Sequence, residues 1–226
     1  MEKLAIVRLI GVLLFLSGGL FAKSPIKIAC VGNSINYGAG MVNREKNAYP
    51  AQLQAMLGED YDVRNFGVNG TTLLKKGDHP YWNTNQFKSA LSYDADLVFI
   101  KLGTNDSKLQ NRVYLADFET DYQSLINSFK EVNEKVRIVL LLPVPSFLED
   151  TSSIWDPVIK GKSTPLTRNV AYDTDVELID LYQLFVDQPG LFPDKIHPSS
   201  NGATVIAKRV YEAVVQKVEI DFDIQE

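Results

Sequence analysis

The apolar run Ile26-Lys27-Ile28-Ala29-Cys30-Val31 predicts a buried strand, and Gly32-Asn33-Ser34-Ile35 follows it directly. A serine at a tight turn from a strand into a helix projects its hydroxyl clear of the sheet, with backbone N–H groups close by. A hydroxyl in that place becomes nucleophilic when a base lies next to it. Ser34 is therefore a candidate nucleophile, although a Gly-Asn-Ser turn is also common without any catalytic role.

Further short apolar runs alternate with helical patterns along the rest of the chain. Strands are expected at 62–66, 97–102, 136–142 and 176–180, and helices at 49–57, 115–134, 164–172 and 200–218. This alternation predicts an α/β fold, a three-layer α/β/α sandwich around a central, mainly parallel five-stranded sheet. Thr164-Pro165 is typical of an N-cap and first turn, whereas residues 143–163 are irregular and are expected to form a surface excursion.

The first 22 residues have the pattern of a secretory signal peptide. Lys3 and Arg8 precede an apolar stretch over 9–16, and small residues up to Ala22 offer cleavage positions. That stretch is short for a bilayer span of about 20 residues, although an uncleaved N-terminal anchor is the alternative. We therefore expect one domain over 23–226, secreted or periplasmic, with no stable membrane insertion after cleavage.

Composition excludes several other functions. The net charge of -5 and the lack of a basic cluster argue against a nucleic-acid partner. The single cysteine, Cys30, cannot form an internal disulfide and is expected to be a buried, inert thiol. One cysteine and two histidines far apart in sequence do not suggest a zinc site, so we expect no metal and no cofactor.

Asp194-Lys195-Ile196-His197 lies just before the last predicted helix. Two intervening residues let one loop present both side chains to one point. The Asp194 carboxylate could then hold the imidazole by Nδ1–H and leave Nε2 to take the serine proton. An Asp-x-x-His pattern is a weak signal alone, but His197 is one of only two histidines in the chain.

Two more loops follow predicted strands at the sheet edge where ligands bind in such folds. Gly103-Thr104-Asn105-Asp106 offers the Asn105 side chain as a donor to a developing oxyanion. The loop at 65–71 contains Gly70, whose backbone N–H could serve the same oxyanion. Both loops are also ordinary turn sequences, and Asp106 is expected at most to cap the next segment.

The four segments resemble, in order, the conserved blocks of the SGNH hydrolases, a branch of the GDSL-type esterases and lipases. The resemblance spans residues 26–202. It implies the three-layer fold and an acyl-transfer mechanism with Ser34 as nucleophile, His197 as base and Asp194 as its orienting carboxylate. It also implies oxyanion donors at Ser34 N–H, Gly70 and Asn105. One position departs from the family, because Asn33 stands where an aspartate is usual.

The residues around the second and third blocks are similar to bacterial carbohydrate esterases of the sialate O-acetylesterase-like type. We therefore expect a secreted serine esterase that removes O-acetyl groups from a polysaccharide or a small-molecule ester. A lysophospholipase or thioesterase, and a non-catalytic glycan-binding domain, remain alternatives. The substrate-binding candidates are Asn33, His79, Tyr81 and Trp82. Tyr81 and Trp82 could stack on sugar rings or could instead pack their own loop down.

Overall fold

The computed structural model describes residues 24–216 and contains one sheet at its centre. The strands lie in the order β2-β1-β3-β4-β5 and every described ladder is parallel. Their bounds are β1 Ile26–Gly32, β2 Tyr61–Gly67, β3 Leu97–Lys101, β4 Arg137–Leu141 and β5 Glu177–Ile179. The predicted five-stranded parallel sheet is confirmed, and no strand end differs from its expected position by more than one residue.

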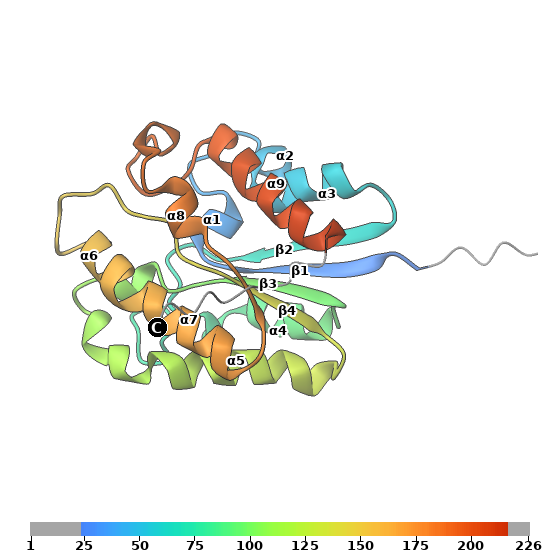
Figure 1. Cartoon of the computed structure of the whole chain (residues 1–226), viewed down its shortest axis with the longest axis horizontal. Coiled ribbons are helices and arrows are strands. Elements are labelled where there is room, and N and C mark those ends of the chain that lie inside the picture. The colour runs from blue at the N-terminus through green and yellow to red at the C-terminus, as the bar shows by residue number, and fades with distance from the viewer. Residues whose placement is uncertain (1–23, 217–226) are drawn as a thin grey trace, which may run out of the picture.

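Helices cover both faces of the sheet, as Figure 1 shows. One layer contains α3 (Tyr49–Leu57), α8 (Leu181–Phe185) and α9 (Ser200–Val215), and the other contains α4 (Asn85–Ser92), α5 (Phe118–Val132) and α7 (Thr164–Asp173). Three short helices, α1 (Ser34–Tyr37), α2 (Arg44–Asn47) and α6 (Asp156–Val158), lie in the connections. Because both faces are covered, every residue of β3 is buried, which explains why its sequence is almost uninterruptedly apolar.

Each face of the sheet has its own hydrophobic core. Phe118, Tyr122 and Ile126 of α5 pack on the face formed by alternate residues such as Val98 and Ile100. The opposite core contains Cys30 from β1, whose burial raises the pKa of its thiol to about 12. The expectation of a buried, inert Cys30 agrees with this position, since the thiolate is the reactive form.

The prediction for residues 143–163 is partly wrong. Residues 156–163 are helical and continue directly into α7, so Thr164 lies inside a helical stretch and is not its N-cap. The reason is tertiary packing, because Ile159 is buried against Leu142 and Tyr182 in a third apolar cluster.

Helix α4 was also not expected, since its eight residues form only about two turns of amphipathic pattern.

The order of the strands determines where a site can form. The connection after β1 leads to β2 on one side, and the connection after β3 leads to β4 on the other side. These two connections diverge, so a crevice forms between the carboxyl ends of β1 and β3. Gly67 allows α1 to sit against this edge, because a Cβ at Gly67 would lie 2.3 Å from the Tyr37 backbone nitrogen. The loops after β1, β2 and β3 therefore meet at one point.

Within residues 24–216, none of the helices combines the length and the apolar character needed to cross a bilayer. The predicted signal peptide over 1–22 lies outside the described residues.

Candidate active site

Ser34 is the first residue of α1 and follows β1 after only Asn33. The Asn33 side chain caps this helix, since its Oδ1 accepts a hydrogen bond from Ile35 N–H at 3.2 Å. Asn33 is completely buried, and its Nδ2 is a buried group without a hydrogen-bond partner. The prediction that Asn33 contacts substrate is therefore wrong; it holds the turn that presents Ser34.

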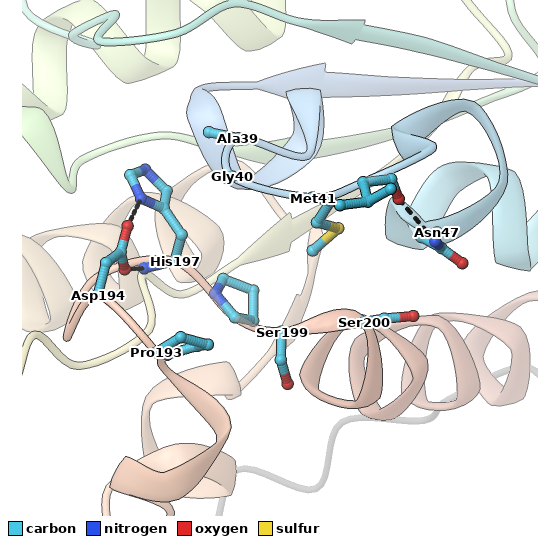
Figure 2. A pocket seen from close by; sticks show the side chains of 11 residues that line it. Ala39, Gly40, Met41, Asn47, Pro193, Asp194, His197, Ser199 and Ser200 are labelled. Carbon is cyan, nitrogen blue, oxygen red and sulfur yellow. Dashed lines mark hydrogen bonds and ion pairs between the residues drawn. The ribbon is translucent and has the colours of Figure 1, made fainter.

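Asp194 and His197 lie in the loop before α9, where the aspartate organises the turn around itself. Its Oδ1 accepts hydrogen bonds from the backbone N–H groups of Ile196 at 3.0 Å and His197 at 2.6 Å. Its Oδ2 lies 2.6 Å from His197 Nδ1 (Figure 2). Burial raises the pKa of Asp194, but these hydrogen bonds outweigh that effect and the pKa lies below its usual value. The carboxylate is therefore ionised and fixes the imidazole ring.

The structure brings Ser34 and His197 together, although 163 positions separate them in sequence. His197 Nε2 lies 2.9 Å from Ser34 Oγ, while Nδ1 faces Asp194. Ser34 is 7% exposed, so its hydroxyl is shielded but reachable. This Asp–His–Ser chain is the arrangement in which an imidazole can take a proton from a serine hydroxyl.

Gly70 and Asn105 line the same hollow as Ser34 and His197, a cavity of about 290 Å³ that Asn69, Ala39 and Ile154 also line. Gly70 has a φ of +75°, a conformation that favours glycine. The Asn105 amide donates one hydrogen to Thr71 O at 2.9 Å, so its second hydrogen is available to a ligand. Both predicted donors therefore lie beside the serine.

Asp106 has a different role from the cap expected for it. Its carboxylate is completely buried and accepts hydrogen bonds from the backbone N–H groups of Leu73 at 3.2 Å and Leu74 at 2.8 Å. Burial raises the pKa of Asp106 to about 6, although these backbone donors oppose that effect. The consecutive residues Asn105 and Asp106 thus fasten the loop that carries Gly70 to the loop after β3.

The aromatic residues of the 75–87 loop are structural. Tyr81 is completely buried and its hydroxyl donates to Phe66 O at 2.8 Å, so the prediction that it stacks on a sugar is wrong. Trp82 donates from Nε1 to Leu73 O at 2.8 Å and packs edge-on against Phe87. The alternative expectation, that both rings pack the loop down, describes their contacts.

His79 is exposed and lies next to Gly70, because a Cβ at Gly70 would be 3.7 Å from its Nδ1. Its position beside a residue that lines the cavity keeps His79 a candidate for substrate contact. Among the described residues, no three His, Cys, Asp or Glu side chains are grouped in a way that could hold a metal ion.

Two residues went unnoticed in the sequence, Ile154 in the cavity lining and Lys101 in the core next to it. Ile154 comes from the irregular stretch before α6, where no periodicity marks it. Lys101 ends β3 and is completely buried, with its ammonium group 3.2 Å from Thr104 Oγ1. Burial lowers the pKa of Lys101 to about 7. A charged residue at the end of an apolar strand was the available signal for this unusual lysine.

Comparison with known proteins gives consistent matches. A family model described as the GDSL-like lipase/acylhydrolase family matches residues 30–205. An acetylxylan esterase of Xylanibacter ruminicola is 38% identical over 210 residues, covering 85% of this chain and 44% of that protein. The chain thus spans less than half the length of this relative.

Solved structures match with lower sequence identity. A lipase/acylhydrolase from Enterococcus faecalis has a TM-score of 0.66 at 21% identity, covering 87% of this chain and 98% of the other. An acetyl xylan esterase has a TM-score of 0.67 at 24% identity, with coverages of 84% and 100%. At these identities the two structures support the fold alone.

Proposed function

Since the chain belongs to the GDSL-like lipase/acylhydrolase family, we propose that it is a carboxylic ester hydrolase that removes O-acetyl groups from a carbohydrate. The family supports ester hydrolysis. The carbohydrate acetyl ester is supported by the relative named acetylxylan esterase, which matches over 85% of this chain. The alternative acyl substrates, lysophospholipids and thioesters, enter as outcomes of the test below.

The observation that carries the proposal is the pair of contacts at His197, 2.9 Å to Ser34 Oγ and 2.6 Å to Asp194. Ser34 Oγ attacks the ester carbonyl carbon while its proton passes to His197 Nε2. The imidazolium returns that proton to the leaving alcohol oxygen, and the acetyl group stays on Ser34. Water, losing a proton to the same nitrogen, then attacks the acyl-enzyme carbonyl. The bond to Ser34 Oγ breaks, the imidazolium returns the proton to that oxygen, and acetate is released.

The negative charge that develops on the carbonyl oxygen needs donors already in position. The Ser34 N–H lies in the first turn of α1, where backbone N–H groups have no intrahelical acceptor. The Asn105 amide and the Gly70 N–H lie in the same cavity. Donors fixed in this way stabilise the charge without reorganisation, which is worth about 10²- to 10³-fold in kcat for each donor.

Substrate profiling of the wild type and the Ser34→Ala variant tests this proposal. We expect the wild type to hydrolyse p-nitrophenyl acetate faster than the butyrate and octanoate esters, and to release acetate from acetylated xylan. Ser89, an exposed serine on α4, gives the matched control Ser89→Ala, which should keep full activity.

Two outcomes would contradict the proposal. Equal rates for the wild type and Ser34→Ala would remove catalysis by this site and would leave a non-catalytic domain. A preference for octanoate would favour a lysophospholipase or thioesterase over an acetylesterase.

We also propose that the protein is exported, on the basis of the basic, apolar and small-residue pattern of residues 1–22. Polysaccharides are met outside the cytoplasm, so export agrees with the proposed substrate. Expression of the full chain in a bacterial host should give a periplasmic or extracellular product that begins near residue 23. Cytoplasmic protein that retains Met1 would contradict this localisation.

A further inference from the structure

A second hollow of about 330 Å³ lies next to His197 and adjoins the one over Ser34. One wall is the connection between α1 and α2, at residues 39–42, and the other is the loop at 193–200 that leads into α9. Figure 2 shows these two walls facing each other across the space. We call this hollow the 40/200 groove.

The groove continues from the cavity over Ser34, because Ala39 and His197 line both. On one side of these two residues lie Gly70, Asn105 and Ile154. On the other side lie Met41, Val42 and Ser200. His197 therefore stands between a space that contains the oxyanion donors and a space that contains none of them.

The proposed acyl transfer assigns a different substrate group to each space. The tetrahedral carbon carries Ser34 Oγ, the oxyanion, the acyl substituent and the leaving alcohol. The oxyanion points at Gly70 and Asn105, and the leaving oxygen must lie within hydrogen-bonding reach of His197 Nε2 to receive its proton. A bulky alcohol therefore extends past His197, toward the 40/200 groove. The acyl substituent remains beside Ile154.

The lining of the groove suits an alcohol that has both apolar faces and polar groups. Met41, Val42, Pro193 and Pro198 supply apolar surface, and Asn47, Ser199 and Ser200 supply polar atoms. A sugar ring presents C–H groups on its faces and hydroxyls around its edge. Val42 is 79% exposed, so its side chain is accessible to a ligand in the groove.

The wall at 39–42 is held in place before any ligand binds. Asn47 Nδ2 donates to Val42 O at 2.7 Å. The Arg44 guanidinium lies 3.9 Å from the centre of the Tyr37 ring and donates to Tyr37 O at 3.2 Å. A wall fixed in this way loses little conformational entropy on binding.

We propose that the 40/200 groove binds the sugar that carries the ester, as the subsite for the leaving alcohol. This inference rests on the proposed function, since it uses the direction of proton transfer from His197. It assigns residues 40–42 and 199–200 to carbohydrate recognition and leaves Ile154 to contact the acyl group.

The Ser200→Trp variant tests the proposal by filling the groove from an exposed position at the start of α9. Three substrates separate the two halves of the ester: an acetylated xylo-oligosaccharide, methyl acetate and methyl hexanoate. We expect KM for the acetylated oligosaccharide to rise at least fivefold, while kcat/KM for both methyl esters stays within twofold. Ser89→Trp places the same ring on α4 and should change none of the three.

Val42→Trp fills the groove from the other wall, so the test does not depend on one variant folding. A lower kcat/KM for methyl hexanoate alone would show that the groove binds the acyl chain, and this would overturn the proposal. Equal effects on all three substrates, or no effect on any, would overturn it as well.

A binding measurement separates this inference from the proposed function. Calorimetric titration of Ser34→Ala with unacetylated xylotetraose should give binding that Ser200→Trp weakens at least fivefold in the same background. If the wild type hydrolysed no ester, the proposed function would fail while this binding could still be observed. If hydrolysis occurred but both proteins bound xylotetraose equally or not at all, only the groove assignment would fail.

Discussion

The Asp106→Asn substitution should lower kcat without lowering the free energy of unfolding. Both oxygens of the buried carboxylate accept backbone N–H groups, from Leu73 and Leu74, in the loop that carries Gly70. An amide keeps one acceptor oxygen and turns an NH₂ donor toward the other N–H. A hydrogen bond to a charged group contributes about 1.5–3 kcal/mol. If that energy positions Gly70 relative to Asn105 in the transition state, its loss lowers kcat by roughly 10- to 100-fold.

The effect on stability has the opposite sign. Burial raises the pKa of Asp106 to about 6, so the folded state holds the proton more tightly than the unfolded chain does. The stability that Asp106 contributes is therefore fully present below about pH 4 and is lost as the pH rises through 6. At pH 7.5 ionisation costs the folded state roughly 3 kcal/mol. The neutral amide avoids this cost, so the variant should unfold at an equal or higher urea concentration.

The assay measures acetate release and urea unfolding for the wild type, Asp106→Asn and the exposed control Asp173→Asn. Below pH 6 the wild-type carboxyl is itself protonated, so the ratio of the two kcat values should shrink toward one. In a double-mutant cycle with Asn105→Ala, the two losses of transition-state stabilisation, calculated from kcat, should be less than additive. The reason is that Asp106 acts through the oxyanion donors. Unchanged kcat at pH 7.5, or a loss of kcat that only follows a lower folded fraction, would refute this reasoning.

Three other substitutions follow from the same contacts. Asn105→Ala should lower kcat by about 10²- to 10³-fold with little change in KM, measured on p-nitrophenyl acetate; an equal rise in KM would point to ground-state binding instead. Asp194→Asn should lower kcat by up to about 10⁴-fold, because the amide no longer fixes the imidazole tautomer; full activity would remove Asp194 from the proposed triad. Lys101→Met should raise the free energy of unfolding at pH 7 by roughly 4 kcal/mol, because burial lowers the lysine pKa to about 7. The difference in free energy of unfolding between Lys101→Met and the wild type should then shrink as the pH rises from 7 to 10.5, and urea titrations in which this difference does not change with pH would contradict the prediction.

The central strands β1, β3 and β4 were predictable because they are buried on both faces, so each reads as a short apolar run between turn residues. The edge strands β2 and β5 are partly exposed, and their sequences mix apolar with charged residues. Helix α4 and the helical stretch at 156–163 were not predictable, because tertiary packing stabilises them more than their own periodicity does. The loops that present Ser34 and His197 could be predicted, because topology brings the carboxyl ends of parallel strands to one edge.

The outer parts of the site depend on contacts between residues far apart in the sequence. Sequence left Tyr81 open between sugar stacking and loop packing, and only the structure shows its hydroxyl donating to Phe66 O inside the core. Asp106 looked like a turn residue, since its partners Leu73 and Leu74 lie more than 30 positions away. Long-range hydrogen bonds of this kind leave no local pattern. The two walls of the 40/200 groove likewise come from opposite ends of the chain.

The central claim is that His197 activates the Ser34 hydroxyl as a nucleophile. The direct measurement is intact-protein and peptide mass spectrometry after reaction with diethyl p-nitrophenyl phosphate, which phosphorylates activated serines and cannot be turned over readily. We predict one diethylphosphoryl group, located on Ser34, and none on Ser34→Ala or His197→Ala under the same conditions. An adduct on another residue, or equal labelling of the His197→Ala protein, would contradict the claim.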